Sequence, residues 1–155
     1  MVDKALMMAS NSLMFFKTAE ILNSVLKSAS DANNAHLLGL YFIPHIVNKS
    51  FAVEMALKAI LTREGIPYST GKDGHRIDVL FNSLPEELRK TISNKLETIL
   101  EGTDFDKQLV EIGGAFTDWR YFHEKSNSIK HDFFNIFAVN VCRLCYQMCN
   151  IQEVG

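Results

Sequence analysis

Residues 51–61 read Phe-Ala-Val-Glu-Met-Ala-Leu-Lys-Ala-Ile-Leu, a run made almost entirely of strong helix formers. Apolar residues surround Glu54 and Lys58 on nearly every side, so the segment predicts a helix with little room for a solvent-exposed face. The two charged residues stand four apart, in the order that favours an ion pair on a helix. Two readings stay open: an ordinary surface pair, or a partly buried pair that needs a further polar partner because desolvation is costly.

The same helical spacing extends upstream of this run. Apolar residues three, four or seven apart predict a first helix at roughly residues 3–28, followed by a polar turn at about 30–34. A second long helix is predicted at roughly 33–64, with a kink or a local restart at Pro44. Gly65 provides its C-terminal stop and opens a glycine- and proline-rich loop over residues 65–76.

Downstream, a short helix is predicted from Ile77 to Asn82, and Ser83-Leu84-Pro85-Glu86 matches a capping box with Ser83 as the N-cap. The following helix, ending at Gly102, is expected to carry one apolar face composed of Leu88, Ile92, Leu96, Ile99 and Leu100.

Two further helices complete the prediction. Asp104 is a suitable N-cap for a helix that reaches roughly to Glu124, with Gly113-Gly114 in its middle as either a close crossing or a hinge. The polar stretch Ser126-Asn127-Ser128 separates it from a last helix that runs to about Ile151.

The chain carries no alternating run and no hairpin signal of the kind that predicts strands. Its 155 residues suffice for one ordinary domain. We therefore expect a single all-α domain over residues 1–155, built as an up-and-down bundle of four to five helices.

The composition argues against several classes of protein. The net charge of −2 argues against a surface built wholly to bind polyanions, and 47% hydrophobic residues argue against disorder. The longest uncharged apolar run, His36 to Val47, is too short for a membrane helix, so no membrane association is expected. An N-terminus without a positive leader and an odd count of three cysteines predict free thiols and a cytoplasmic location.

The cysteine motif Cys142-Arg-Leu-Cys145, with Cys149 four residues on, lies deep in a predicted helix. A redox pair would stand at a helix N-terminus, and a zinc site would need a second pair of ligands at metal spacing. The three thiols instead share one apolar stripe, which is typical of core packing. No metal and no cofactor is expected.

The densest chemical stretch is Asp118-Trp-Arg-Tyr-Phe-His-Glu124. On a helix, Arg120, His123 and Glu124 share one face, which combines a phosphate-binding guanidinium with an imidazole that titrates near neutral pH. The aromatic residues beside them suit either base stacking or core packing. Among the other histidines, His75 is expected to cap a helix or fix the loop, and three are expected to be structural or solvated: His36, His45 and His131.

Three features in this order resemble the HEPN superfamily, named for nucleotide binding in higher eukaryotes and prokaryotes. They are Glu54-Met-Ala-Leu-Lys58-Ala-Ile-Leu, Gly74-His75-Arg-Ile-Asp-Val-Leu80-Phe81, and Trp119-Arg120-Tyr121 with Glu124. The resemblance covers roughly residues 40–145 and implies a small helical bundle that dimerises around a basic cleft.

Many members of that superfamily are metal-independent ribonucleases whose site is an Arg, four to six residues, and then a His. The Arg would hold the scissile phosphate while the His handles the proton of the attacking 2′-hydroxyl. Here only two residues separate Arg120 from His123. Other members lack the catalytic pair and bind RNA, nucleotides or a protein, often a nucleotidyltransferase-like partner.

The resemblance thus implies a homodimeric RNA- or nucleotide-directed binding module in a toxin–antitoxin or phage-defence setting. Its binding residues would be Glu54, Lys58, His75, Tyr121 and Glu124. One alternative is an active endoribonuclease with Arg120 and His123 as the catalytic pair, and another is a helical adaptor without a ligand.

Overall fold

The computed structural model describes residues 1–114 and 128–153, and these residues are helical with no strand among them. The all-α prediction is confirmed. The described part holds six α-helices, one more than the upper bound expected, and one short 3₁₀ helix. The elements are α1 (Lys4–Asp31), α2 (Ala35–Arg63), η1 (Lys72–His75), α3 (Ile77–Asn82), α4 (Glu86–Ile99), α5 (Phe105–Gly113) and α7 (Ser128–Met148).

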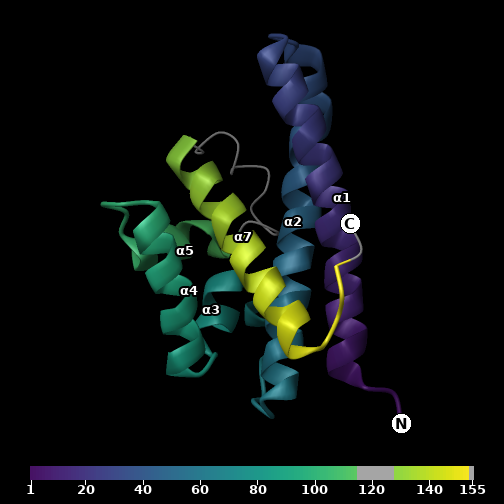
Figure 1. The fold of residues 1–155 in the computed structure, drawn as a ribbon, viewed down its shortest axis with the longest axis vertical. Coiled ribbons are helices and arrows are strands. Elements are labelled where there is room, and N and C mark those ends of the chain that lie inside the picture. The colour runs from purple at the N-terminus through teal and green to yellow at the C-terminus, as the bar shows by residue number, and fades with distance from the viewer. Residues whose placement is uncertain (115–127, 154–155) are drawn as a thin grey trace.

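Helices α1 and α2 form a long antiparallel hairpin that extends beyond the other helices (Figure 1). Asp3 caps α1 by accepting from the amide of Leu6 at 3.1 Å, and Asn34 caps α2 by accepting from the amide of Leu37 at 3.1 Å. At the other end of α2, Gly65 adopts a φ of 69°, which supplies the expected stop. Pro44 lies inside α2, which continues through it without a break, so the local restart suggested by the sequence does not occur.

The capping box predicted at Ser83 is wrong. Ser83 is the C-cap of α3, and its hydroxyl donates to the carbonyl oxygen of Val79 at 2.9 Å. Pro85 occupies the N-cap position of α4 without a side-chain hydrogen bond. Glu86 stands in the first turn of α4, where its carboxylate interacts favourably with the positive end of the helix dipole. Because α3 ends directly before α4 begins, the serine serves the helix behind it rather than the one ahead.

The predicted apolar face of α4 is largely correct, since Ile92 and Leu96 are buried and Leu88 and Leu100 pack against the core. Ile99 is the exception, with 57% of its surface exposed.

Helix α5 ends at Gly113, with Gly114 as its C-cap, so the glycine pair terminates a helix that was expected to continue to Glu124. Asp104 caps its start as predicted and accepts from the amide of Lys107 at 3.1 Å. A Cβ added to Gly113 would lie 2.3 Å from a carboxylate oxygen of Asp78 on α3. The sequence left open a close helix crossing or a hinge, and Gly113 is where α5 packs closely against α3.

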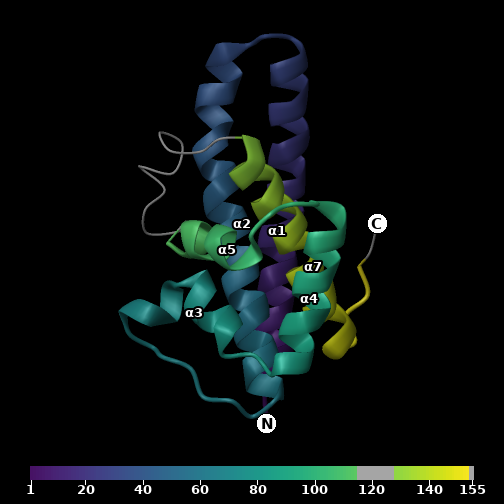
Figure 2. The same cartoon turned by 90° about the vertical axis from the view of Figure 1, so that its left-hand side faces the viewer.

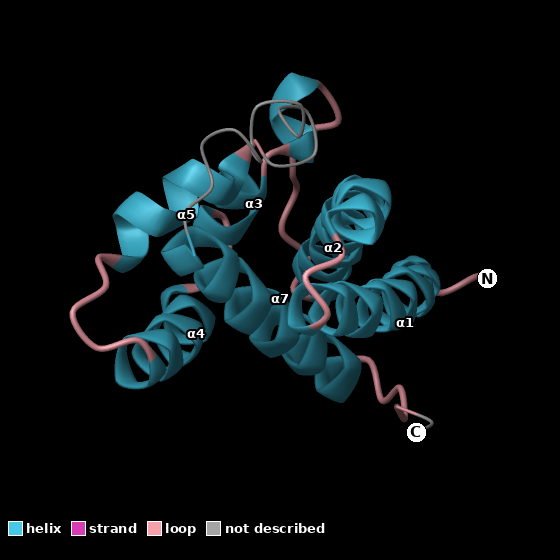
Figure 3. Ribbon diagram, turned by 90° about the horizontal axis from the view of Figure 1, so that it is seen from above, coloured by secondary structure: helices cyan, strands magenta, loops and turns pink. Residues whose placement is uncertain are grey.

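Helix α7 lies between the α1–α2 hairpin and the pair α4–α5, as the view from above shows (Figure 3). It brings Phe133, Phe134 and Phe137 into the core, together with the three cysteines. All three cysteines are buried and free, which confirms the core-packing prediction. Among the described residues, no helix has the length and apolar character needed to cross a membrane.

Candidate functional site

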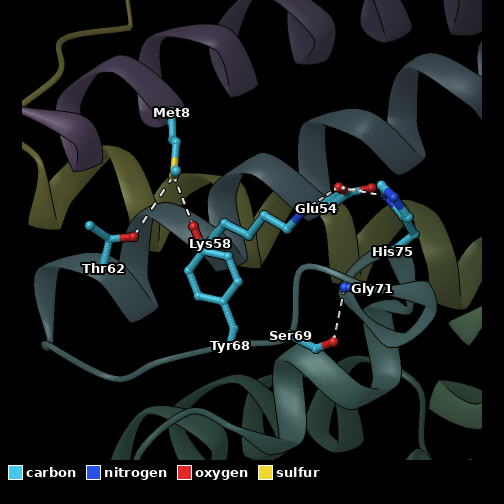
Figure 4. Close-up of polar contacts among 8 residues, drawn as sticks. All are labelled: Met8, Glu54, Lys58, Thr62, Tyr68, Ser69, Gly71 and His75. Atoms are coloured by element: carbon cyan, nitrogen blue, oxygen red, sulfur yellow. Dashed lines mark hydrogen bonds and ion pairs between the residues drawn. The ribbon is translucent and has the colours of Figure 1, made fainter.

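The buried carboxylate of Glu54 on α2 connects two segments that are distant in sequence. Its Oε1 accepts from Lys58 Nζ at 2.7 Å and lies 3.1 Å from Nδ1 of His75 in η1 (Figure 4). Glu54 is only 2% exposed, whereas the side chain of His75 is 47% exposed. The pair is therefore not a surface pair, and His75 is the further partner that a buried carboxylate requires.

The chain before His75 approaches itself closely. A Cβ on Gly74 would lie 2.2 Å from the carbonyl oxygen of Ser69, so only glycine fits. The Ser69 hydroxyl also accepts from the amide of Gly71 at 3.2 Å, and the amide of Gly74 donates to the carbonyl of Gly71 at 2.9 Å. This compact turn sets the position of His75 against α2, and Figure 2 shows the segment leading to it at the outside of the fold.

Tyr68 completes one side of the arrangement. Its ring lies beneath Lys58, with Nζ 5.8 Å from the ring centroid, and its hydroxyl donates to the sulfur of Met8 on α1 at 3.7 Å. Thr62 donates to the same sulfur at 3.8 Å (Figure 4). The ammonium of Lys58 is thus held between a carboxylate and an aromatic face.

The second carboxylate oxygen of Glu54 is buried without a hydrogen-bond partner among the described residues. A buried acceptor of this kind is costly unless a donor reaches it. Next to His75, Arg76 forms a 3.0 Å ion pair with the buried Asp78. The cluster Glu54, Lys58, His75, Arg76 and Asp78 therefore combines cationic groups with buried carboxylates, a mixture suited to a polar ligand rather than an apolar one.

The structure brings together only part of the predicted site. Glu54, Lys58 and His75 are in contact, but Arg120, Tyr121, His123 and Glu124 lie outside the described residues. The required meeting of the Glu54–Lys58 pair with Arg120 and His123 stays a prediction. Among the described residues, no group of three or more His, Cys, Asp or Glu side chains is arranged to hold a metal ion.

The chain matches no protein-family model, no curated protein and no solved structure. The resemblance to the HEPN superfamily therefore rests on the sequence motifs alone.

A second polar cluster, which was not predicted from the sequence, lies around Lys49, His45 and Asn135 at the boundary of α1, α2 and α7. A signal for it was present: Lys49 falls three residues after buried Ile46 and four before buried Val53, so helical spacing places it on the apolar stripe of α2. His131 and His45, expected to be structural or solvated, belong to this cluster, with ring centroids 5.8 Å apart.

Proposed function

We propose that this protein is an HEPN-like helical module that forms a homodimer and binds RNA or a nucleotide through the surface around Glu54, Lys58 and His75. The convergence of these three residues supports the proposal, because two of the motifs that carry the resemblance meet at one carboxylate. The half-exposed imidazole and the nearby ammonium suit phosphate groups, and the unpartnered oxygen of Glu54 suits a hydroxyl or amine donor.

A toxin–antitoxin or phage-defence setting, with a nucleotidyltransferase-like partner, is part of the same proposal and follows from the resemblance. We also propose that the helices of this chain are arranged as in the bundle of that superfamily.

The direct test is fluorescence anisotropy with labelled mixed-sequence RNA and a labelled nucleotide. Wild-type protein is expected to bind at least one of them, and Glu54→Gln is expected to weaken that binding about tenfold by releasing Lys58 and His75. Glu97→Gln on α4 makes the same change at an exposed position elsewhere and serves as the matched control. Absence of binding in the wild type, or equal loss in the control, contradicts the proposal.

Two measurements separate the alternatives. Incubation with mixed RNA in EDTA identifies a ribonuclease if cleavage is lost in both Arg120→Ala and His123→Ala. Sedimentation velocity determines whether the chain is a dimer. A monomer that binds neither RNA nor nucleotide, and in which Glu54→Gln alters only stability, would be the ligand-free adaptor.

A further inference from the structure

A cavity of about 160 Å³ lies between α1, α2 and α7, and none of the residues that line it belongs to the Glu54 cluster. Its volume is close to the ~150 Å³ that holds one benzene molecule in an engineered lysozyme core, or about five waters. Buried Lys49 and His45 line it from α2 and half-buried Asn135 from α7. Glu20 and Asn23 of α1 are exposed and form its outer side.

Lys49 is buried with only 4% of its surface exposed. Its Nζ donates to Oδ1 of Asn135 and lies 5.1 Å from the ring centroid of Phe134. No carboxylate of the described residues forms an ion pair with it. An ammonium group buried without an anion is unfavourable, and burial lowers the pKa of Lys49 to about 7.

His45 offers the opposite chemistry. Its Nδ1 lies 3.0 Å from the carbonyl oxygen of Ala19, and since a carbonyl can only accept, Nδ1 carries the hydrogen. Burial and the charge of Lys49 lower the pKa of His45 to about 3, so the ring is neutral at pH 7. Its Nε2 is then a bare acceptor, buried and without a partner in the described part of the chain. Asn135 Oδ1 cannot serve it, because both atoms are acceptors.

The cavity thus presents a cationic donor and an unsatisfied acceptor at the same time. We propose that it binds one phosphate group in a form that keeps a P–OH, either free hydrogen phosphate or the monoanion of a small phosphomonoester. Lys49 and the amide nitrogen of Asn135 donate to its oxygens, and the P–OH donates to Nε2 of His45. Carboxylate and sulfate ions are fully deprotonated at pH 7 and would leave that nitrogen unsatisfied. The volume fits a single phosphate tetrahedron better than a nucleotide.

Other charged groups around the cavity also influence the binding of an anion and its pH dependence. Glu20 on α1 repels an anion and is itself paired with Lys17 at 3.3 Å. His131 on α7 is near Lys49, which together with burial lowers the pKa of His131 to about 4, and Asp132 opposes that effect. Phosphate binding is therefore expected to weaken as the pH rises above 7 and Lys49 loses its proton.

The test is a ³¹P NMR titration of the full chain with inorganic phosphate at pH 6.5, with sodium sulfate at equal ionic strength as the competitor. Wild-type protein is expected to broaden and shift the phosphate signal, and sulfate to compete only weakly. Lys49→Met keeps the volume, removes the charge and is expected to weaken binding about tenfold. Lys95→Met removes a charge from the exposed surface of α4 and is expected to change nothing.

Glu20→Gln is a second variant that acts from an exposed position, so its folding is not at risk. It is expected to tighten phosphate binding several-fold because it removes the repelling carboxylate. Repeating the titration with ribose 5-phosphate identifies the source of the group: competition assigns it to a larger ligand, and its absence assigns free phosphate.

An unchanged ³¹P signal with wild-type protein, equal competition by sulfate, or full binding by Lys49→Met would overturn the proposal. The inference does not depend on the proposed function. Loss of RNA or nucleotide binding in Glu54→Gln with phosphate binding intact, or the reverse in Lys49→Met, tells the two sites apart.

Discussion

Glu54 joins two elements of the fold, since one of its buried carboxylate oxygens is shared by Lys58 and His75. Replacing it by glutamine removes the charge that both partners face. We expect a loss of about 3 kcal/mol in unfolding free energy, because the mostly buried Lys58 loses its counter-ion.

Urea denaturation at pH 7 provides the measurement, with Glu54→Met/Lys58→Met as the comparison. The double variant is expected to be more stable than Glu54→Gln, since it leaves no buried charge unpaired. If the two are equally destabilised, packing rather than charge determines the cost at this position.

His131 is the second residue for which the structure specifies an outcome. Its ring lies 5.9 Å from that of Phe42, and burial and Lys49 lower its pKa from 6.5 to about 4. The unfolded chain binds the proton more readily than the folded chain between these values, so stability is fully present above pH 6.5 and is lost as the pH falls towards 4.

His131→Phe is expected to keep the ring contact and to reduce the slope of unfolding free energy against pH over this window. The reduction should be up to about 1 kcal/mol per pH unit, less than the ~1.4 of a complete proton difference. Urea midpoints at pH 6.5, 5.5 and 4.5 measure it, and parallel slopes in both proteins would contradict it.

At the scale of helices, two glycines provide a matched pair. Gly113→Ala on α5 places a Cβ against the carboxylate of the buried Asp78, and we expect it to destabilise by about 2 kcal/mol. Gly39→Ala on α2 meets nothing within 4 Å and is expected to stabilise by about 0.5–1 kcal/mol through helix propensity. Thermal unfolding of the two variants tests both, and a stabilising Gly113→Ala would exclude a tight crossing.

The helices themselves were readable from the sequence because periodicity and caps are local signals. Asp104 and Gly65 perform the roles that their residue types favour. Ser83 did not, because a serine between two adjacent helices can bond in either direction, and the choice depends on how α3 packs. The role of Gly113 could not be decided from the sequence either, because the side chain that leaves no room for a Cβ there belongs to Asp78, 35 positions earlier.

In the candidate site, too, some features follow from local sequence and others depend on tertiary packing. The buried position of Glu54 follows from its apolar neighbours in sequence, but its contact with His75 depends on the close approach of Gly74 to Ser69. Lys49 could have been found on the apolar stripe of α2. The neutral state of His45 could not, because it arises from burial among three packed helices and from the charge of Lys49.

For the whole molecule, the long hairpin predicts uneven stability. None of residues 35–44 of α2 is fully buried, whereas residues 52–61 lie in the core almost throughout. Backbone amides of the first segment are expected to exchange with deuterium at least about tenfold faster than those of the second. Hydrogen exchange followed by mass spectrometry of peptides measures this, and equal protection of both segments would mean that the hairpin opens only with the whole fold.

Ser12 joins three helices at one point, donating to the carbonyl of Ala52 at 2.7 Å and lying 3.0 Å from the hydroxyl of Tyr146. Cys142 lies beside this junction, and burial raises its pKa to about 12. An alkylating reagent such as iodoacetamide attacks only thiolates it can reach, so the native chain should resist it. The mass gained by the chain over time would then count opening events directly, without any denaturant or attached dye.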